Sequence, residues 1–132
     1  MKKVWTNGCF DILHRGHMEL FKFANMLGDQ LMVGLDTDSK VKEDKGEGRP
    51  INTLRDRMFM LQAIKYIHGL TYFDSASDLE DCIKLYAPDI IVVGSDWKGK
   101  TVVGEQYAKE VVFFDRVGDY STTAILDRSV PK

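Results

Sequence analysis

The stretch that decides the fold is Asn7-Gly8-Cys9-Phe10-Asp11-Ile12-Leu13-His14-Arg15-Gly16-His17, near the start of a chain of 132 residues. It follows a short apolar run over 3–6, which predicts a first strand, and precedes an amphipathic run over 17–27, which predicts a first helix. A turn through glycine from a strand into a helix N-terminus is a place to hold phosphate. Two of the three histidines, His14 and His17, lie in this turn with a glycine between them. They indicate phosphate chemistry in addition to phosphate binding.

The length and composition predict one soluble domain spanning residues 1–132. Hydrophobic residues make up 44% and charged residues 29%, which is ordinary for a globular protein. The formal net charge of −2 gives no general attraction for nucleic acid or for an anionic membrane, so we expect neither as a partner.

Cysteine usage and the N-terminus favour a cytoplasmic protein. Cys9 and Cys82 form no CxxC pair, which excludes a cysteine zinc site and predicts reduced thiols. No apolar run approaches the ~20 residues that cross a bilayer. Met1-Lys2-Lys3 leads directly into the first strand and lacks the hydrophobic region of a signal peptide.

Strands and helices alternate along the rest of the chain. We expect Gly28 to end the first helix in a left-handed C-cap conformation, and the lysine- and glycine-rich stretch over 40–50 to be a mobile loop. The pattern predicts further strands at 31–35, 70–73, 89–93 and 110–114, and further helices from Asn52 or Thr53, at 78–86 and from 121 to about 128.

This alternation predicts an α/β fold, a Rossmann-like three-layer α/β/α arrangement around a five-stranded parallel sheet. Ligands of such sheets bind beyond the carboxyl ends of the strands. That rule gathers the loops that start at Asn7, Asp36, Gly94 and Asp115 onto one rim. The sequence therefore predicts one site made from four loops.

The residue types on this rim suit phosphoryl or nucleotidyl transfer. The chain has no GxxxxGK[ST] and no GxGxxG, so it is neither a P-loop protein nor a dinucleotide-binding protein of the usual kind. An acceptor phosphate that attacks the α-phosphorus of a nucleoside triphosphate needs alignment and charge relief, not a strong base. His14 and His17 can donate to the developing charge, and Gly16 lets the backbone approach. Asp11 is the nearest carboxylate for a Mg²⁺ ion.

Each of these residues also has a structural interpretation. A lone histidine is usually structural, and the 40–50 stretch is either a solvated linker or a lid that carries cations. Arg55 and Arg57, near the start of a helix, work against its dipole, which mildly favours an anionic partner for one of them over two solvated side chains. Asp96 could stabilise its own loop, Trp97 could stack on a base or cover the core, and Ser121-Thr122-Thr123 could be an ordinary helix cap.

Two separate signatures give the chain a family resemblance. Gly8-Cys9-Phe10-Asp11 followed by His14-Arg15-Gly16-His17 resembles the HxGH signature of the cytidylyltransferase-like nucleotidyltransferases. Ser121-Thr122-Thr123, with Arg116 at the matching spacing, resembles the second signature of that family. The resemblance extends over nearly the whole chain and implies a Mg²⁺-dependent enzyme that forms homodimers.

The resemblance also implies roles for particular residues. His14 and His17 stabilise the transition state, Lys42 or Lys45 reaches the phosphates, and Arg57 contacts phosphate. The remaining residues implied in nucleotide binding are Gly8, Cys9, Phe10, Asp11, Gly16, Asp96, Trp97, Arg116, Ser121 and Thr122. One departure is His68, which stands where cytidylyltransferases tend to carry an aspartate.

Two members of the family differ in their nucleotide, and the chain resembles both. The Asp96-Trp97-Lys98-Gly99 loop and Arg116 resemble glycerol-3-phosphate cytidylyltransferases, which favours CTP and an acceptor such as glycerol 3-phosphate. The Thr6–His14 stretch, Lys42, the Lys45–Pro50 run and Asn52 resemble the adenylyltransferase domain of ADP-heptose synthases, which would use ATP and a heptose 1-phosphate. A nucleotide-binding module without catalysis is a further alternative, although it has no need of two transition-state donors.

Overall fold

The computed structural model describes residues 1–116 and confirms the predicted architecture. Its parallel five-stranded sheet has the order β3-β2-β1-β4-β5. The strands are β1 (Lys3–Gly8), β2 (Gln30–Asp36), β3 (Gly69–Phe73), β4 (Ile90–Gly94) and β5 (Glu110–Phe114). The α-helices are α1 (Arg15–Met26), α2 (Asp38–Lys45), α3 (Leu54–Gln62) and α4 (Ala76–Tyr86), and two 3-10 turns are η1 (Ser95–Trp97) and η2 (Glu105–Tyr107).

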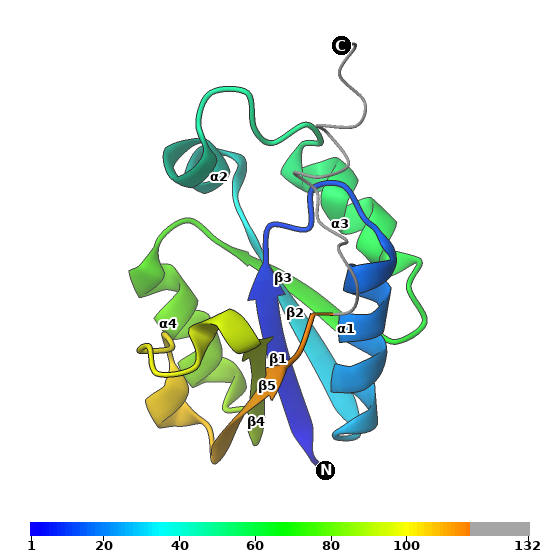
Figure 1. Cartoon of the computed structure of the whole chain (residues 1–132), viewed down its shortest axis with the longest axis vertical. Helices are drawn as coiled ribbons and strands as arrows, with labels where there is room; N and C mark the ends of the chain where they lie inside the picture. The colour runs from blue at the N-terminus through cyan, green and yellow to red at the C-terminus, as the bar shows by residue number, and fades with distance from the viewer. Residues whose placement is uncertain (117–132) are drawn as a thin grey trace.

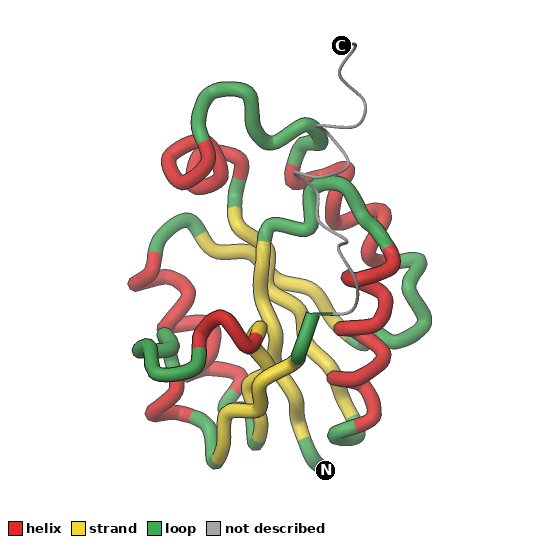
Figure 2. The backbone as a smooth tube through the Cα atoms, viewed as in Figure 1, coloured by secondary structure: helices red, strands yellow, loops and turns green. Residues whose placement is uncertain are grey.

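Helices cover both faces of the sheet, as Figures 1 and 2 show. On one face, Phe21 of α1 and Leu61 of α3 pack on Val4, Val33 and other inward residues of the strands. On the other face, α4 packs on alternate residues of the same strands, since successive side chains of a strand point to opposite faces. Burial of both faces explains why the strands read as continuous apolar runs.

The connections of the sheet place a switch in direction between β1 and β4. The chain moves outward from β1 to β2 and β3, then crosses back to add β4 and β5 on the other side of β1. β1 and β4 are adjacent, but the connections that follow them run to opposite sides. Two such strands leave a crevice between them at their carboxyl ends. The crevice lies between the loop after β1, which carries the histidines, and the loop after β4.

Three local predictions need correction or fall outside the described residues. The 40–50 stretch is not all loop, because α2 runs from Asp38 to Lys45 with the Thr37 side chain accepting from the Lys40 amide as its N-cap. Gly28 does not adopt the left-handed conformation: Leu27 ends α1 with a φ of −82°. A Cβ at Gly28 would meet the Lys2 carbonyl oxygen at 2.8 Å, so close backbone approach explains the glycine. The helix predicted from residue 121 lies outside the described residues.

Candidate functional site

Three adjoining cavities line the carboxyl rim of the sheet. The histidine pocket, of about 190 Å³, lies between the loop after β1 and the ends of β4 and β5 and is lined by His14, Gly16, His17, Leu20, Gly94, Ser95, Asp96, Phe114 and Arg116. The lysine pocket, of about 240 Å³, is lined by Gly8, Cys9, Phe10, Asp11, His17, Lys45 and Arg49. His17 lines both pockets.

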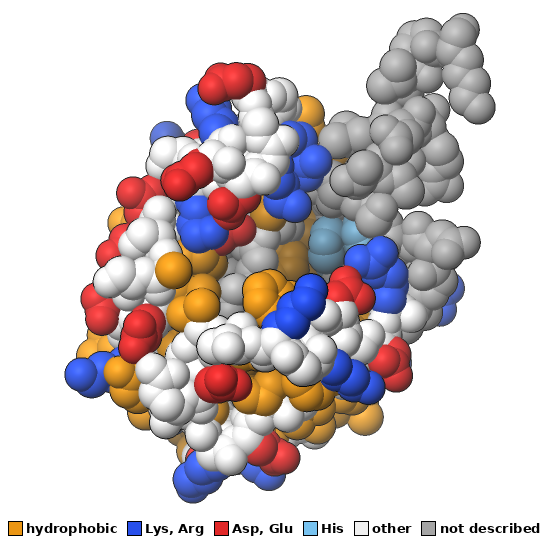
Figure 3. Space-filling view, turned by 60° about the vertical axis from the view of Figure 1, so that its left-hand side comes forward, with side chains coloured by type: hydrophobic (Ala, Val, Ile, Leu, Met, Phe, Trp, Pro, Cys, Tyr) orange, Lys and Arg blue, Asp and Glu red, His pale blue; other side chains and the backbone are white. Residues whose placement is uncertain are grey.

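The third cavity, the large chamber, has a volume of about 500 Å³ and reaches from β1 across β2 to the start of α4 and the 102–103 segment. It shares Gly8, Cys9 and Lys45 with the lysine pocket, and Leu20 and Gly94 with the histidine pocket. The three cavities are therefore one composite site, as the rim prediction required. The hollow in Figure 3 has lysine and arginine side chains around it and histidine at its edge.

The two histidines are stacked at the N-terminus of α1. Their ring centroids are 3.8 Å apart, with an angle of 22° between the planes. The His14 backbone amide donates to Nδ1 of His17 at 3.3 Å. Because Nδ1 of His17 accepts, the ring proton of the neutral imidazole is on Nε2, which leaves that N–H for a ligand.

Both imidazoles are held neutral at physiological pH. Burial, with a smaller effect of His14, lowers the pKa of His17 to about 4. Burial and the nearby Arg116 guanidinium lower the pKa of His14 as well. Neutral imidazoles donate hydrogen bonds to a developing negative charge without releasing a proton, a known device for polarising a reacting group.

The Phe10 ring packs between His17 and the hydrophobic core. Its ring meets the His17 ring edge-on at 5.3 Å between centroids and packs on Phe21 at 5.0 Å. The backbone of Phe10 has a φ of +50°, a left-handed conformation that is uncommon outside glycine. Its side chain is 6% exposed, so it contributes packing under the histidine more than a surface for a nucleotide.

Asp11 differs from its predicted role as a metal ligand. Its side chain is fully buried, and its carboxylate accepts from the backbone amides of Ile51 and Asn52 and from Nε of Arg49. Those donors occupy the oxygens that a cation would need, so Asp11 anchors the 49–52 segment. Among residues 1–116 no group of three or more histidine, cysteine or acidic side chains could hold a metal ion.

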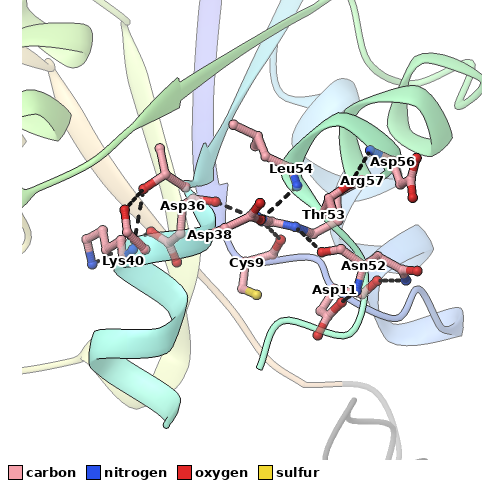
Figure 4. Close-up of polar contacts among 12 residues, drawn as sticks. Cys9, Asp11, Asp36, Asp38, Lys40, Asn52, Thr53, Leu54, Asp56 and Arg57 are labelled. Carbon is pink, nitrogen blue, oxygen red and sulfur yellow. Dashed lines mark hydrogen bonds and ion pairs between the residues drawn. The ribbon is translucent and has the colours of Figure 1, made fainter. Parts of the chain in front are cut away.

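Arg57 also differs from its predicted contact with phosphate. Its guanidinium is fully buried and donates to the carbonyl oxygens of Cys9, Asp36 and Asn52, and to Asp38 Oδ1 at 2.7 Å. Figure 4 shows the side chain at the centre of these groups. Arg57 therefore joins the loop after β1, the end of β2 and the start of α3, and lines none of the three cavities.

The other predicted residues lie on the rim to different degrees. Asp96 lines the histidine pocket, where Arg116 approaches it at 3.7 Å, whereas Trp97 lines the large chamber and is 47% exposed. Lys45 lines two cavities and Lys42 lines none of the three. Cys9 lines the chamber and the lysine pocket, and burial raises its pKa, which keeps the thiol protonated. Ser121 and Thr122 lie outside the described residues.

Sequence reasoning missed several polar residues of the site. Arg49 lines the lysine pocket, and the large chamber has Asp36, Lys40 and Asp44 in its wall. Lys40 and Asp44, four residues apart, would have been placed on one helical face had α2 been predicted, and Asp36 ends the strand before it. None of the helices within the described part of the chain is long and apolar enough to cross a membrane.

Comparison with known proteins gives the site its family context. The chain is 46% identical over 125 residues to the bifunctional protein HldE of Campylobacter fetus, and 46% identical over 126 residues to that of Helicobacter hepaticus. These matches span 95% and 96% of this chain, but only 27% and 26% of the relatives' own length.

A solved structure also matches this chain over most of its length. The lipopolysaccharide core biosynthesis protein of Thermoplasma volcanium has a TM-score of 0.68 and 26% identity, over 92% of this chain and 99% of that one. A pantothenate synthetase from Thermus thermophilus, at 16% identity and a TM-score of 0.58, shares the fold alone. A sequence model of the family described as cytidylyltransferase-like matches residues 5–127. The chain belongs to the cytidylyltransferase-like family of nucleotidyltransferases.

Proposed function

We propose that this protein transfers an adenylyl group from ATP to the phosphate of a sugar phosphate, such as a heptose 1-phosphate, and releases pyrophosphate. The observation that carries the reaction type is the pair of neutral, stacked histidines at the N-terminus of α1, inside a composite polar cavity. The 40–47% identity to HldE proteins favours the ADP-heptose type of adenylyltransferase over the cytidylyltransferase that the distal loop alone favoured.

The chemistry needs little from the protein beyond position and charge relief. An acceptor phosphate is largely ionised at pH 7 and attacks the α-phosphorus directly. A new bond forms from the acceptor oxygen to that phosphorus, and the bond to the β-phosphate bridging oxygen breaks. Nε2–H of His17 donates to the α-phosphoryl oxygens, while His14, Lys45 and Arg49 lie where the phosphates would pass between the cavities.

The nucleoside would occupy the histidine pocket, beside Asp96 and Arg116. By the family resemblance, Ser121 and Thr122 complete this pocket. Mg²⁺ would come with the triphosphate, because the described carboxylates do not assemble a dedicated site for it and Mg²⁺ commonly binds through substrate phosphates. We further propose that the protein is cytoplasmic and forms a homodimer.

A second candidate function is a cytidylyltransferase that uses CTP and glycerol 3-phosphate. The observation in its favour is the loop after β4, where Asp96 and Arg116 form a loose ion pair in the histidine pocket and Trp97 lies next to them. These are the residues by which this chain resembles the glycerol-3-phosphate cytidylyltransferases.

The test is an assay of pyrophosphate release with each of the four nucleoside triphosphates, Mg²⁺ and a panel of sugar and polyol phosphates. We expect release with ATP and a heptose 1-phosphate. Release with CTP and glycerol 3-phosphate alone would replace the first function by the second. Binding of a nucleotide with no release for any pair would make the protein a nucleotide-binding module without catalysis.

A further inference from the structure

The wall of the large chamber is unusually polar on one side. Three charged residues line this side of the chamber. They are Asp36 at the end of β2, Lys40 in the first turn of α2 and Asp44 in the second turn of α2. Lys40 Nζ lies 2.7 Å from Asp44 Oδ2 and 3.7 Å from Asp36 Oδ1. The remaining lining is mostly apolar and includes Phe73, Leu79, Val93, Val102 and Val103. The chamber therefore offers charged groups to one side of a ligand and a hydrophobic surface to the other.

The carboxylate of Asp36 is partly buried and accepts no hydrogen bond from the described residues. Its side chain is 15% exposed, and the 3.7 Å separation from Lys40 exceeds a hydrogen bond. Within residues 1–116 no hydrogen bond reaches its carboxylate oxygens, whereas its backbone carbonyl is taken by Arg57. Burial raises the pKa of Asp36. Because Asp36 lines the chamber, its carboxylate can accept hydrogen bonds from a ligand there.

The surroundings hold these side chains in place without a ligand. Thr37 caps α2, and its hydroxyl and that of Ser39 donate to Asp74 at the end of β3. Lys40 is 20% exposed and lies between the two carboxylates, which gives it a restricted position. Figure 4 shows Lys40 on α2 close to Asp36 at the end of β2. A preformed polar row over an apolar surface is typical of a small-molecule site.

We propose that Asp36 and Lys40 bind the hydroxyl groups of the acceptor, which is a neutral polyhydroxylated carbon skeleton attached to the reacting phosphate. The inference rests on the proposed function and adds the acceptor subsite to it. A hydroxyl both donates and accepts, so an adjacent carboxylate and ammonium match neighbouring hydroxyls of a sugar or polyol. The C–H face of the same skeleton packs on the apolar side of the chamber.

The position of the chamber agrees with this assignment. The lysine pocket, which includes Lys45, Arg49 and His17, adjoins the chamber and shares Gly8, Cys9 and Lys45 with it. A phosphate between Lys45 and His17 leaves its carbon skeleton directed into the chamber, away from the histidine pocket that takes the nucleoside.

The charge of the wall disfavours other kinds of acceptor. Two carboxylates, Asp36 and Asp44, face two ammonium groups, Lys40 and Lys45, so the formal charge of the lining is zero. A neutral skeleton meets no net repulsion there. A quaternary ammonium acceptor such as phosphocholine would meet Lys40 at the centre of the wall, and a second anionic group would meet the two carboxylates.

The experiment compares hydroxylated acceptors with one that lacks hydroxyls. Heptose 1-phosphate, glycerol 3-phosphate and ethyl phosphate are each assayed with ATP in the wild type, Asp36→Asn and Lys40→Met. The loss of a charged hydrogen bond predicts a fall of roughly tenfold in kcat/KM for the preferred hydroxylated acceptor. Ethyl phosphate should change less than twofold, and the KM for ATP should stay within twofold. Asp81→Asn and Lys84→Met, both on the exposed side of α4, are the matched controls.

Calorimetric binding of the same three phosphates to the protein alone separates this inference from the proposed function. Weaker binding of the hydroxylated phosphate to Asp36→Asn supports the subsite even if no nucleotide is turned over. An equal loss for ethyl phosphate and the hydroxylated acceptor would overturn the inference, as would a preference for phosphocholine. A failure of the wild type to bind either hydroxylated phosphate would also overturn it.

Discussion

At the scale of single residues, the site depends on the orientation of His17. Its Nδ1 accepts from the His14 amide, its ring stacks on the His14 ring, and Phe10 supports it from the core. A hydrogen bond donor aimed at a developing charge is worth more when its position is fixed before the reaction. His17 thus has three independent constraints on its ring before any ligand arrives.

Replacement of His17 by glutamine should reduce kcat by about 10²–10³, which is the usual cost of removing one such donor. The KM for ATP should change little, because the donor acts mainly on the transition state. Steady-state kinetics of pyrophosphate release measure both quantities. His68→Gln serves as the control, because His68 accepts from the Leu31 amide at the amino ends of β2 and β3 and lines none of the three cavities. Full turnover by the His17 variant would refute the mechanism.

The low pKa of His17 predicts a dependence of stability on pH. In the unfolded chain this group has the ordinary value of 6.5, and in the folded protein it has a value of about 4. Between these values the unfolded state binds more protons, so stability falls as the pH is lowered from about 6.5 towards 4. Urea unfolding at several pH values should show this fall, and His17→Gln should show less of it. An NMR titration of His17 with a midpoint above 6 would contradict the prediction.

Residue types could be predicted from the sequence, but their roles only in part. The histidine pair and its place on the rim followed from the glycine turn after an apolar strand. Asp11 and Arg57 were predicted to contact a metal ion and phosphate, whereas in the structure both side chains bind groups of the protein itself. Their partners are the amides of Ile51 and Asn52 and the carbonyl of Cys9, which are tertiary contacts that no local spacing encodes.

At the scale of elements, α2 was the main difference between sequence and structure. It has little apolar periodicity, and Val41 is its only buried residue among those described. The signals present were those of its ends: Thr37 as an N-cap, acidic Asp38 in the first turn, lysines in the last turn and Gly46, with a φ of 98°, after it. The N-cap and the charges at its two ends therefore explain why α2 is helical, although its hydrophobic pattern does not predict a helix.

Arg57 connects the loop after β1, the end of β2 and the starts of α2 and α3. Its replacement should therefore lower the stability of the whole fold. Arg57→Met leaves three carbonyl oxygens and the Asp38 carboxylate without their shared donor, and we expect the free energy of unfolding to fall by about 3 kcal/mol or more. Arg55→Met, two residues earlier and exposed, should stay within about 0.5 kcal/mol. Equilibrium denaturation in urea compares the two, and equal stability losses would show that the buried network contributes nothing specific.

At the scale of the whole molecule, the order of the strands assembles the site. Residues 8 to 17 and residues 94 to 97 are far apart in the chain, and they meet because β4 pairs with β1. Alternating strands and helices predicted the common rim but not this pairing, which requires the chain to cross over after α4. The histidine pocket lies at the ends of β4 and β5, whereas the large chamber extends from the end of β4 past β1 to the ends of β2 and β3.

The proposed homodimer has a candidate face between α3 and the edge strand β3. Phe59 and Tyr72 line one surface depression there and are 73% and 57% exposed. Arg55 and Asp56 border the same depression, so a two-fold axis could pair each arginine with the aspartate of the other copy. An edge strand with exposed aromatic side chains beside it is a surface that a partner commonly covers.

The prediction is that Phe59→Glu makes the protein monomeric, since two buried carboxylates would face each other across the axis at the centre of the interface. Leu85→Glu is the matched control, because Leu85 is 90% exposed on α4, which covers the other face of the sheet. Sedimentation velocity over a range of micromolar concentrations compares the two variants with the wild type. A wild type that sediments as a monomer throughout would remove the dimer, and a dimeric Phe59→Glu would place it on another face. Because Phe59 and Leu85 are both largely exposed, Phe59→Glu should leave the stability of each monomer, measured in urea, close to that of Leu85→Glu.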